Sequence, residues 1–421
     1  MADKIETTNL KNAPADLSES TTKDWAEITR FGVVGFFLGN MVWIFGLGVI
    51  QLILLIETMV RAIFITIGQA SISAEQFVAY ESNVLATEVK FEEFLAGFTN
   101  LFDQSGLLIP ILVALGFFWW RYNYDTEGRR GVWMTTIRSM FRNRSAVSGF
   151  VMIGLLALIA NFAMLIAPYD PTETLVGRPR TKPCVNIELI NITCEGDAYT
   201  FGTDLNGRDL FSRVIWGARI SIPIGLIAVM ISIFFGTIIG LIAGFYGGWI
   251  DNIIMRVMDV LLAFPGLLLA IAIVTVLGPG LQNALIAIAI VATPSYARLM
   301  RASVLTLKEQ EFILAERALG ASNRRIMFSQ ILPNALTPIV VQGTLGIGTA
   351  VLDAAALSFL GLGAQPPAPE WGQMLGESFN FFQTAPYLVF YPGVCIMITV
   401  LGFNLLGDGI RDALDPRLNK N

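Results

Sequence analysis

Residue types that commonly do chemistry are scarce in this sequence of 421 residues. It contains no histidine and three cysteines, so zinc, haem and histidine-base sites lack their usual ligands. It contains seven lysines, and none of them follows a glycine, which excludes a Walker A loop. Whatever energy source this protein uses, it does not bind ATP through a P-loop of its own.

A segment with the features of a docking element lies between Tyr296 and Pro333. From Leu307 to Leu319 apolar residues recur at helical spacing with charged residues between them, which predicts an amphipathic helix. Gly320 predicts a helix C-cap or a sharp bend, and Pro333 is expected to end a second short helix. The pattern fits either a helix lying on a lipid surface or an element that enters a groove on a partner. The bend at Gly320 favours the docking element.

Asp353 is a carboxylate deep in a long apolar run. Such a residue costs about 2.5 to 3.5 kcal/mol inside a membrane unless it faces a bundle interior or an aqueous cavity. Two interpretations remain open: Asp353 lines a translocation path, or it forms an interhelical hydrogen bond.

A second candidate site is a cluster of four alternating charges, namely Asp204, Arg208, Asp209 and Arg213. The cluster could contact an exterior protein or cap a translocation path. Internal salt bridges are the alternative.

Membrane spans are the elements that must position these residues. Apolar residues make up 54% of the chain and charged residues 14%, against about 25% charged in soluble domains, and the mean hydropathy is +0.63. Several apolar runs can cross a hydrocarbon core of about 30 Å, which predicts a polytopic, all-α transmembrane bundle in membrane lipid. The net charge of −5 argues against a nucleic-acid partner. The eight predicted spans cover about residues 31–56, 106–120, 146–167, 220–246, 257–277, 281–296, 336–362 and 386–406.

Basic residues in the loops predict the orientation. Six arginines lie between the second and third spans, and six basic residues lie in the loop 297–335. By the positive-inside rule both loops are cytoplasmic, which places the loop 168–219 outside and both chain termini inside. The loop 168–219 also carries six basic residues, but long loops count less in this rule.

Cys184 and Cys194 lie in this predicted exterior loop with nine residues between them. On the oxidising side of a membrane such a pair can form a disulfide. Two free thiols are the alternative, because spacing alone does not establish the geometry. Cys395 falls within the last span and is predicted to pack there.

The docking segment resembles the EAA loop of the membrane subunits of binding-protein-dependent ABC importers. The resemblance rests on Ala315 to Gly320 and on the Ile331-Leu332-Pro333 that follows. Other stretches resemble the C-type subunit of the dipeptide and oligopeptide permease branch. They are FGTDLNGRD (201–209), YGGWID (246–251), FPG (264–266), LSFLGLG (357–363), WGQML (371–375), GDGIRD (407–412) and DPR (415–417). The resemblance covers about residues 136 to 418, roughly two thirds of the chain.

Two features depart from the family pattern. The glutamate that commonly opens the EAA motif falls at Leu314, and Glu316 takes the place of the second alanine. A shift of two residues turns a helical side chain by about 200°, so Glu316 cannot make the same partner contact in the same way. The first 135 residues are also absent from the usual six-span subunit. Their two added spans either pack around the core, facing lipid, or form a docking site for another subunit.

The resemblance implies an importer with four kinds of component. They are this chain, a paralogous permease subunit with which it forms a heterodimer, two ABC ATPases that bind ATP and Mg²⁺, and an extracytoplasmic solute-binding protein. It also implies that residues 307–321 are a coupling helix seated in a cleft of an ATPase. The residues expected to couple are Phe312, Leu314, Ala315, Glu316, Arg317, Ala318, Leu319, Gly320 and Ala321.

The sequence thus predicts a disordered cytoplasmic tail (1–30), an extension with two transmembrane helices (31–135) and a six-span permease domain (136–421). This domain has the type I ABC importer fold, with the exterior loop 168–219 and the coupling loop 297–335. The predicted function is a non-enzymatic, multi-pass permease subunit of an ATP-driven importer in the cell membrane, for dipeptides or oligopeptides, with no cofactor or metal bound by this chain. A secondary transporter or channel would need ion relays in the spans, and a scaffold or sensor would leave the docking segment without an ATPase.

Overall fold

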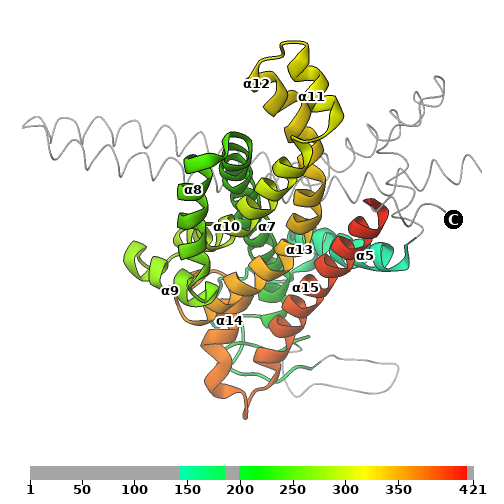
Figure 1. Cartoon of the computed structure of the whole chain (residues 1–421). Coiled ribbons are helices and arrows are strands. Elements are labelled where there is room, and N and C mark those ends of the chain that lie inside the picture. Colours follow the sequence, from blue (N-terminus) through cyan, green and yellow to red (C-terminus); the bar gives the residue numbers. More distant parts are fainter. Residues whose placement is uncertain (1–142, 185–198, 415–421) are drawn as a thin grey trace, which may run out of the picture.

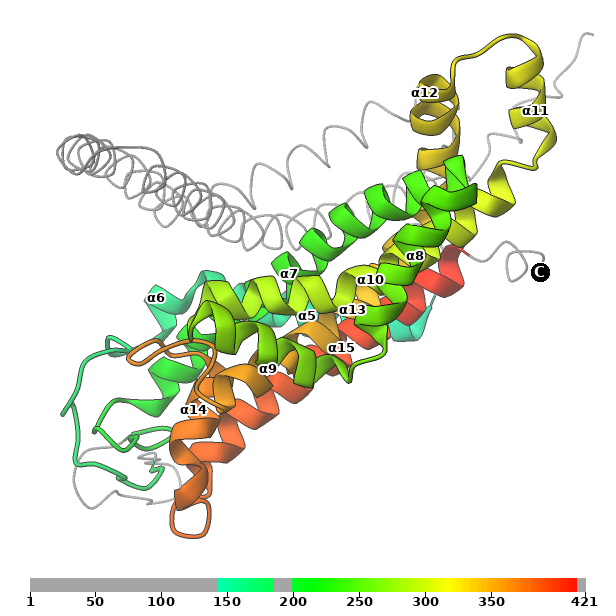
Figure 2. The same ribbon diagram turned by 60° about the vertical axis from the view of Figure 1, so that its left-hand side comes forward.

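The computed structural model describes residues 143–184 and 199–414. In these ranges the regular structure is helical apart from an isolated β-bridge between Thr203 and Asp209. The helices are α5 (Arg144–Asn161), α6 (Ala163–Ile166), α7 (Leu210–Tyr246), α8 (Gly248–Leu262), α9 (Gly266–Leu277), α10 (Leu281–Leu307), α11 (Glu311–Ala318), α12 (Asn323–Arg325), the π-helix η2 (Ile326–Ile331), α13 (Leu332–Phe359), α14 (Trp371–Ser378), the 3₁₀-helix η3 (Phe379–Phe381) and α15 (Tyr387–Leu414). The bundle is elongated, with α11 and α12 at one end and α14 near the other (Figures 1 and 2).

Five helices in the described ranges are long and apolar enough to cross a membrane, or six if the bent pair α8 and α9 forms one span. This confirms the predicted all-α transmembrane bundle. The predicted spans 146–167, 220–246, 281–296, 336–362 and 386–406 correspond to α5 with α6, α7, α10, α13 and α15. The predicted tail 1–30 and the predicted spans 31–56 and 106–120 lie outside the described residues.

The predicted span 257–277 is not one continuous helix, because the chain breaks between α8 and α9 and turns by 93°. Pro265 lies at this break as the N-cap residue of α9. Proline has no backbone N–H to donate and disfavours a helical conformation at the preceding residue, here Phe264. Hydropathy alone did not detect the break, because the residues on both sides of it are apolar.

Helix α7 begins at Leu210, ten residues before the apolar run, so residues 210–219 of the predicted loop 168–219 are helical. The Asp209 carboxylate caps this start: it accepts hydrogen bonds from the backbone N–H and the hydroxyl of Ser212, at 2.8 and 2.6 Å. Such a side chain supplies an acceptor for a helical N–H that has no partner within the helix. The cap, and not the hydropathy, sets the first residue of α7.

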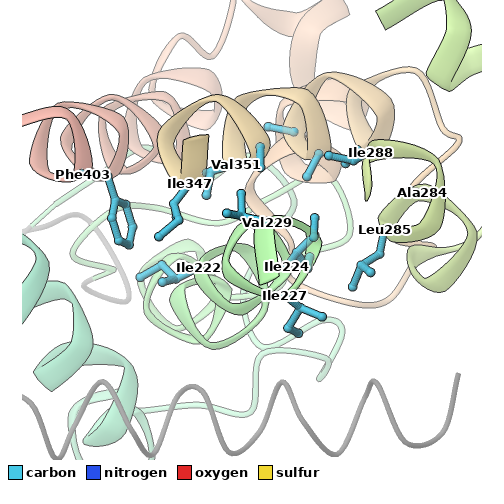
Figure 3. Packing of buried hydrophobic residues seen from close by; sticks show 14 of the residues in the cluster. Ile222, Ile224, Ile227, Val229, Ala284, Leu285, Ile288, Ile347, Val351 and Phe403 are labelled. Atoms are coloured by element: carbon cyan, nitrogen blue, oxygen red, sulfur yellow. The ribbon is translucent and has the colours of Figure 1, made fainter. Parts of the chain in front are cut away.

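Helix α7 packs closely against α10 through a row of glycines. A Cβ at Gly236 would lie 2.6 Å from the Cβ of Tyr296, and one at Gly244 would lie 2.9 Å from the Cβ of Val304. A row of small residues lets two helix backbones approach closely in a membrane. In the sequence, Gly236, Gly240 and Gly244 recur at intervals of four, a spacing that predicts close packing against a neighbouring helix, and the contact with α10 confirms it. Figure 3 shows the apolar core farther along the same helices, with Val229 of α7, Ile288 of α10 and Val351 of α13.

Two ion pairs connect α8 with α10. The Arg301 guanidinium donates to both carboxylate oxygens of Asp251, at 2.5 and 2.6 Å, while Arg298 donates to Asp259 at 2.9 Å. The side chains of Arg301 and Asp251 are 33% and 11% exposed, against 57% and 56% for Arg298 and Asp259. Bidentate geometry and burial make the first pair the stronger one.

Replacing Asp251 with alanine is expected to lower the free energy of unfolding by about 3 kcal/mol, because it leaves a partly buried arginine without its counter-ion. The matched change Asp259→Ala, between the same two helices, is expected to cost less than about 1 kcal/mol, because that pair is exposed. Thermal unfolding of the purified protein in detergent measures both. Equal losses in the two variants would contradict this ranking.

Candidate functional site

Helices α11, α12 and η2 form a protrusion at one end of the bundle, within the predicted docking segment (Figure 2). Helix α10 ends at Leu307, and α11 begins at Glu311 after a short turn. The predicted helix from Leu307 therefore starts four residues too early. Gln310 has the extended backbone of an N-cap residue, with φ −73° and ψ 146°, which separates the two helices.

Gly320 ends α11 in the left-handed conformation, with φ +80°. The Gly320 N–H donates to the carbonyl of Arg317, and the Ala321 N–H donates to the carbonyl of Glu316, both at 3.0 Å. These two bonds form a Schellman motif, in which glycine is favoured because a Cβ opposes a positive φ. The predicted C-cap at Gly320 is confirmed.

One face of α11 holds it against the rest of the protein. Ile313 is completely buried, and the Gln330 side-chain amide donates to the Glu316 carboxylate at 3.1 Å. Gln330 belongs to η2, so this bond connects the two limbs of the protrusion. Glu316, the displaced glutamate of the resemblance, is thus used in a contact within this chain.

Three large apolar side chains of α11 and its C-cap residue are exposed. The exposed fraction of Leu319 is 86%, and Phe312 and Leu314 are 42% and 49% exposed. Exposed large apolar side chains that are grouped at a protein surface mark contact sites more often than single, scattered ones do. The remaining predicted coupling residues that are exposed are Ala315, Arg317, Ala318 and Gly320, and Glu316 and Ala321 are half-buried. Their contact with an ATPase stays a prediction.

The second limb differs from the predicted short helix, because Pro333 does not end it. Residues 323–359 form one continuous helical run through α12, η2 and α13. A proline in a regular α-helix clashes with the carbonyl four residues earlier. The π-helical turn of η2 ends two residues before Pro333 and includes the residue four positions before it, so its wider backbone accommodates the ring.

The predicted charged cluster is buried and paired within the chain. Arg208 contacts Asp204 at 2.5 Å and Glu377 of α14 at 3.2 Å, and Arg213 contacts Asp204 at 3.4 Å. Asp209 caps α7 as described above. The internal salt bridges of the second alternative are therefore present, and they connect the segment before α7 with α14. A contact with an exterior protein or a capping role on the path stays a prediction.

Cys184 is disulfide-bonded. Its predicted partner Cys194 lies outside the described residues, so the pairing stays a prediction. Cys395 is a free, half-buried thiol in α15.

Sequence reasoning missed a buried carboxylate, Glu370, at the end opposite the protrusion. It caps α14: it accepts hydrogen bonds from the backbone N–H of Gln373 at 2.8 Å and from the Ser221 hydroxyl at 3.0 Å. Trp371 packs beside it and donates its indole N–H to the carbonyl of Val214 in α7 at 2.9 Å. The junction thus joins α7 to α14. The sequence signal that could have revealed Glu370 as a cap is an acidic residue directly before a short amphipathic helix.

Burial raises the pKa of Glu370 above its ordinary value, and backbone N–H donors at Gly372 and Gln373 oppose this rise. Removal of a carboxylate from water disfavours its charged form, whereas donated hydrogen bonds favour that form. Burial is the larger effect here.

Asp353 lies in a cavity of about 130 Å³ between α7, α10 and α13. Ser232 and Tyr296 line its buried side, and Thr349 and Gln342 line its exposed side. Asp353 is six residues from the end of α13, about 9 Å at the rise of a helix. The structure therefore places the carboxylate beside a cavity with both polar and apolar walls, near the end of the bundle opposite the protrusion.

The chain matches two family models. Residues 236–420 match the binding-protein-dependent transport system inner membrane component, and residues 131–183 match the N-terminal TM domain of oligopeptide transport permease C. An inward-facing MetNI methionine ABC transporter structure covers 46% of this chain and 95% of that chain, at 24% identity and a TM-score of 0.37. That score does not by itself establish a shared fold.

Curated relatives match most of their own length. The dipeptide transport system permease protein DppC of Alkalihalophilus pseudofirmus is 51% identical over 286 residues, which are 68% of this chain and 90% of that protein. DppC of Haemophilus influenzae is 48% identical over 66% of this chain and 92% of that protein. The glutathione transport system permease protein GsiD of Pectobacterium atrosepticum is 44% identical over 69% of this chain and 92% of that protein. This chain therefore belongs to the family of binding-protein-dependent transport system inner membrane components, the multi-pass membrane permease subunits of ABC importers.

Proposed function

We propose that this chain is the C-type permease subunit of an importer for dipeptides or other short peptides, and that it has no enzymatic activity of its own. The names of its relatives at 48% to 51% identity support this substrate class. The absence of a Walker A loop from its sequence fits a subunit that is driven by ATP hydrolysis elsewhere. We further propose that residues 136–421 form the permease domain and residues 31–135 an added two-span extension.

The proposed assembly contains a paralogous permease subunit, two ATPases that bind ATP and Mg²⁺, and an extracytoplasmic solute-binding protein. The chain termini and the protrusion then face the cytoplasm, and α14 faces the exterior. Basic residues at the protrusion, including Arg317, Arg324 and Arg325, support this orientation by the positive-inside rule.

The observation that carries the proposal is the construction of the protrusion. Ile313 and the Glu316–Gln330 bond hold α11 in place, while Phe312, Leu314 and the C-cap residue Leu319 are exposed at its surface. The protrusion is also joined to two spans: α10 leads into it, and η2 leads from it into α13. An ATPase that grips the exposed side would displace both spans together, as in a rigid-body transition between inward-open and outward-open states.

Purification of the assembled complex in mild detergent tests the assembly. Co-purifying ATPases support the importer. A chain that purifies alone and moves solute in liposomes would instead indicate a secondary transporter, and a chain that does neither would indicate a scaffold.

Replacing Gly320 with valine is expected to reduce substrate-stimulated ATPase activity by roughly fivefold to thirtyfold. A β-branched residue at φ +80° costs about 1 to 2 kcal/mol, which corresponds to that range. No atom lies within 4 Å of a Cβ at Gly320, so the cost is conformational and not a clash. Gly320→Asn is expected to retain coupling, because asparagine tolerates this conformation.

Gly361 provides a matched control at the other end of the bundle. It has φ +76° and equally free space around a Cβ, so Gly361→Val carries a similar backbone cost away from the protrusion. We expect the substrate-stimulated ATPase activity of Gly361→Val to stay near that of the unmodified protein. Unchanged coupling in Gly320→Val, or an equal loss in both variants, would count against α11 as the coupling helix.

A further inference from the structure

The cavity beside Asp353 is lined by polar side chains and by apolar ones such as Val229 and Ile288, and the polar side chains that α13 contributes lie on one face of that helix. Gln342, Gly346, Thr349 and Asp353 all line the cavity, at intervals of four, three and four residues. Side chains with this spacing lie on one side of a helix. The row extends over eleven residues, or about 16 Å. Extended dipeptide backbone spans about 7 Å, so the row is long enough to contact such a molecule along its length.

Asp353 has no basic partner among residues 143–184 and 199–414. The ion pairs within these ranges belong to Asp204, Glu377, Asp259 and Asp251. A carboxylate in an apolar span is costly unless a cation or an aqueous cavity compensates it. Asp353 has the cavity but no cation from the described residues. A cationic ligand could therefore supply the missing positive charge.

The size of the cavity limits the ligand. At about 30 Å³ per water molecule, 130 Å³ corresponds to about four waters. Complete pockets for small molecules are larger, about 300 to 1,000 Å³. The cavity therefore accommodates one end of a ligand. Its exposed side, at Ser295, Gln342 and Thr349, leaves the remainder outside.

We propose that Asp353 and this cavity bind the terminal ammonium group of the transported peptide. This inference rests on the proposed peptide transport. A primary ammonium offers three N–H donors, which match the Asp353 carboxylate and the hydroxyl oxygens of Thr349 and Tyr296 around the cavity. A resident metal ion fits less well, because no group of three or more His, Cys, Asp or Glu residues in the described ranges could hold one.

The first test is transport by the assembled importer in liposomes, with radiolabelled dialanine as the substrate. Asp353→Asn is expected to reduce uptake at least about tenfold, because it removes the charge that pairs with the ammonium group. Asp353→Glu is expected to retain most of the uptake. Asp259→Asn, which removes an exposed carboxylate from α8, is the matched control and is expected to have little effect.

The second test reads the charge of the cavity without transport. Ser295→Cys, on the exposed side of the cavity, is made in a Cys395→Ser background that removes a free thiol and is treated with cationic and anionic methanethiosulfonate reagents. The cationic reagent is expected to react at least about tenfold faster, and Asp353→Asn is expected to abolish this preference. Dialanine should protect the thiol, whereas N-acetyl-dialanine, which lacks the ammonium, should not.

These measurements separate the two proposals. If the unmodified complex takes up no peptide but shows the charge preference and protection by dialanine, peptide import is contradicted and the ammonium site stands. If peptide is taken up normally by Asp353→Asn, or the two reagents react equally, the ammonium site is contradicted and import stands. Equal protection by dialanine and N-acetyl-dialanine would also overturn recognition of the ammonium group.

Discussion

Replacing Gly240 with leucine is expected to leave almost no correctly folded protein. A Cβ at this position would overlap the backbone carbonyl oxygen of Ala297 and lie 2.8 Å from the Cβ of Met300, both in α10. A backbone atom cannot move aside as a flexible side chain can, so α7 and α10 must separate. Ordinary overpacking costs about 1 to 3 kcal/mol, and separation of these two spans should exceed that range. Size-exclusion chromatography of the detergent-solubilised protein measures the loss as a missing monodisperse peak.

Gly393 is the matched control, because it also lies in an apolar helix, α15, but a Cβ added to it would have no atom within 4 Å. Gly393→Leu is expected to give a normal peak, since leucine is also a better helix former than glycine. A normal peak for Gly240→Leu would mean that α7 and α10 do not depend on close approach at this point.

Replacing Glu370 with alanine is expected to give the second largest effect, a loss of about 2 to 5 kcal/mol in the free energy of unfolding. The change removes the cap of α14 and leaves the Gln373 N–H and the Ser221 hydroxyl buried without their acceptor. Each unsatisfied buried group costs about 1 to 3 kcal/mol, and loss of a cap costs about 1 kcal/mol. Thermal unfolding in detergent measures the loss. A change below about 1 kcal/mol would show that α14 and α7 are held together by other contacts.

Glu370→Gln separates charge from shape at the same site. Because burial raises the pKa of Glu370, the folded state binds the proton more tightly than the unfolded state does. Stability from this group is therefore complete below the ordinary pKa of 4.5 and falls as the pH rises through the folded-state pKa. The glutamine variant cannot titrate, so its stability should fall less than that of the unmodified protein between pH 4.5 and neutral pH. Parallel pH profiles would contradict this.

Several features could be predicted from the sequence because each follows from local chemistry. Apolar run length predicted five of the six spans that fall in the described residues, since a helix must be long enough to cross the hydrocarbon core. Gly320 predicted its own C-cap, because few other residues adopt φ +80° without strain. The spacing of Gly236, Gly240 and Gly244 predicted a closely packed helix pair.

Other features depended on atoms that are distant in sequence. The cluster around Arg208 could have faced an exterior partner or its own chain, and the tertiary structure brings Glu377, 169 residues away, into contact with Arg208. Glu370 became part of a junction because Ser221, 149 residues away, donates to it. Asp353 gained a cavity because α7 and α10 lie beside α13. The sequence by itself determined where helices can form and how closely two can pack, because these depend on the period and size of nearby side chains. The tertiary structure alone decided which polar groups are paired, capped or left facing a cavity, because their free energies depend on neighbours that only folding brings together.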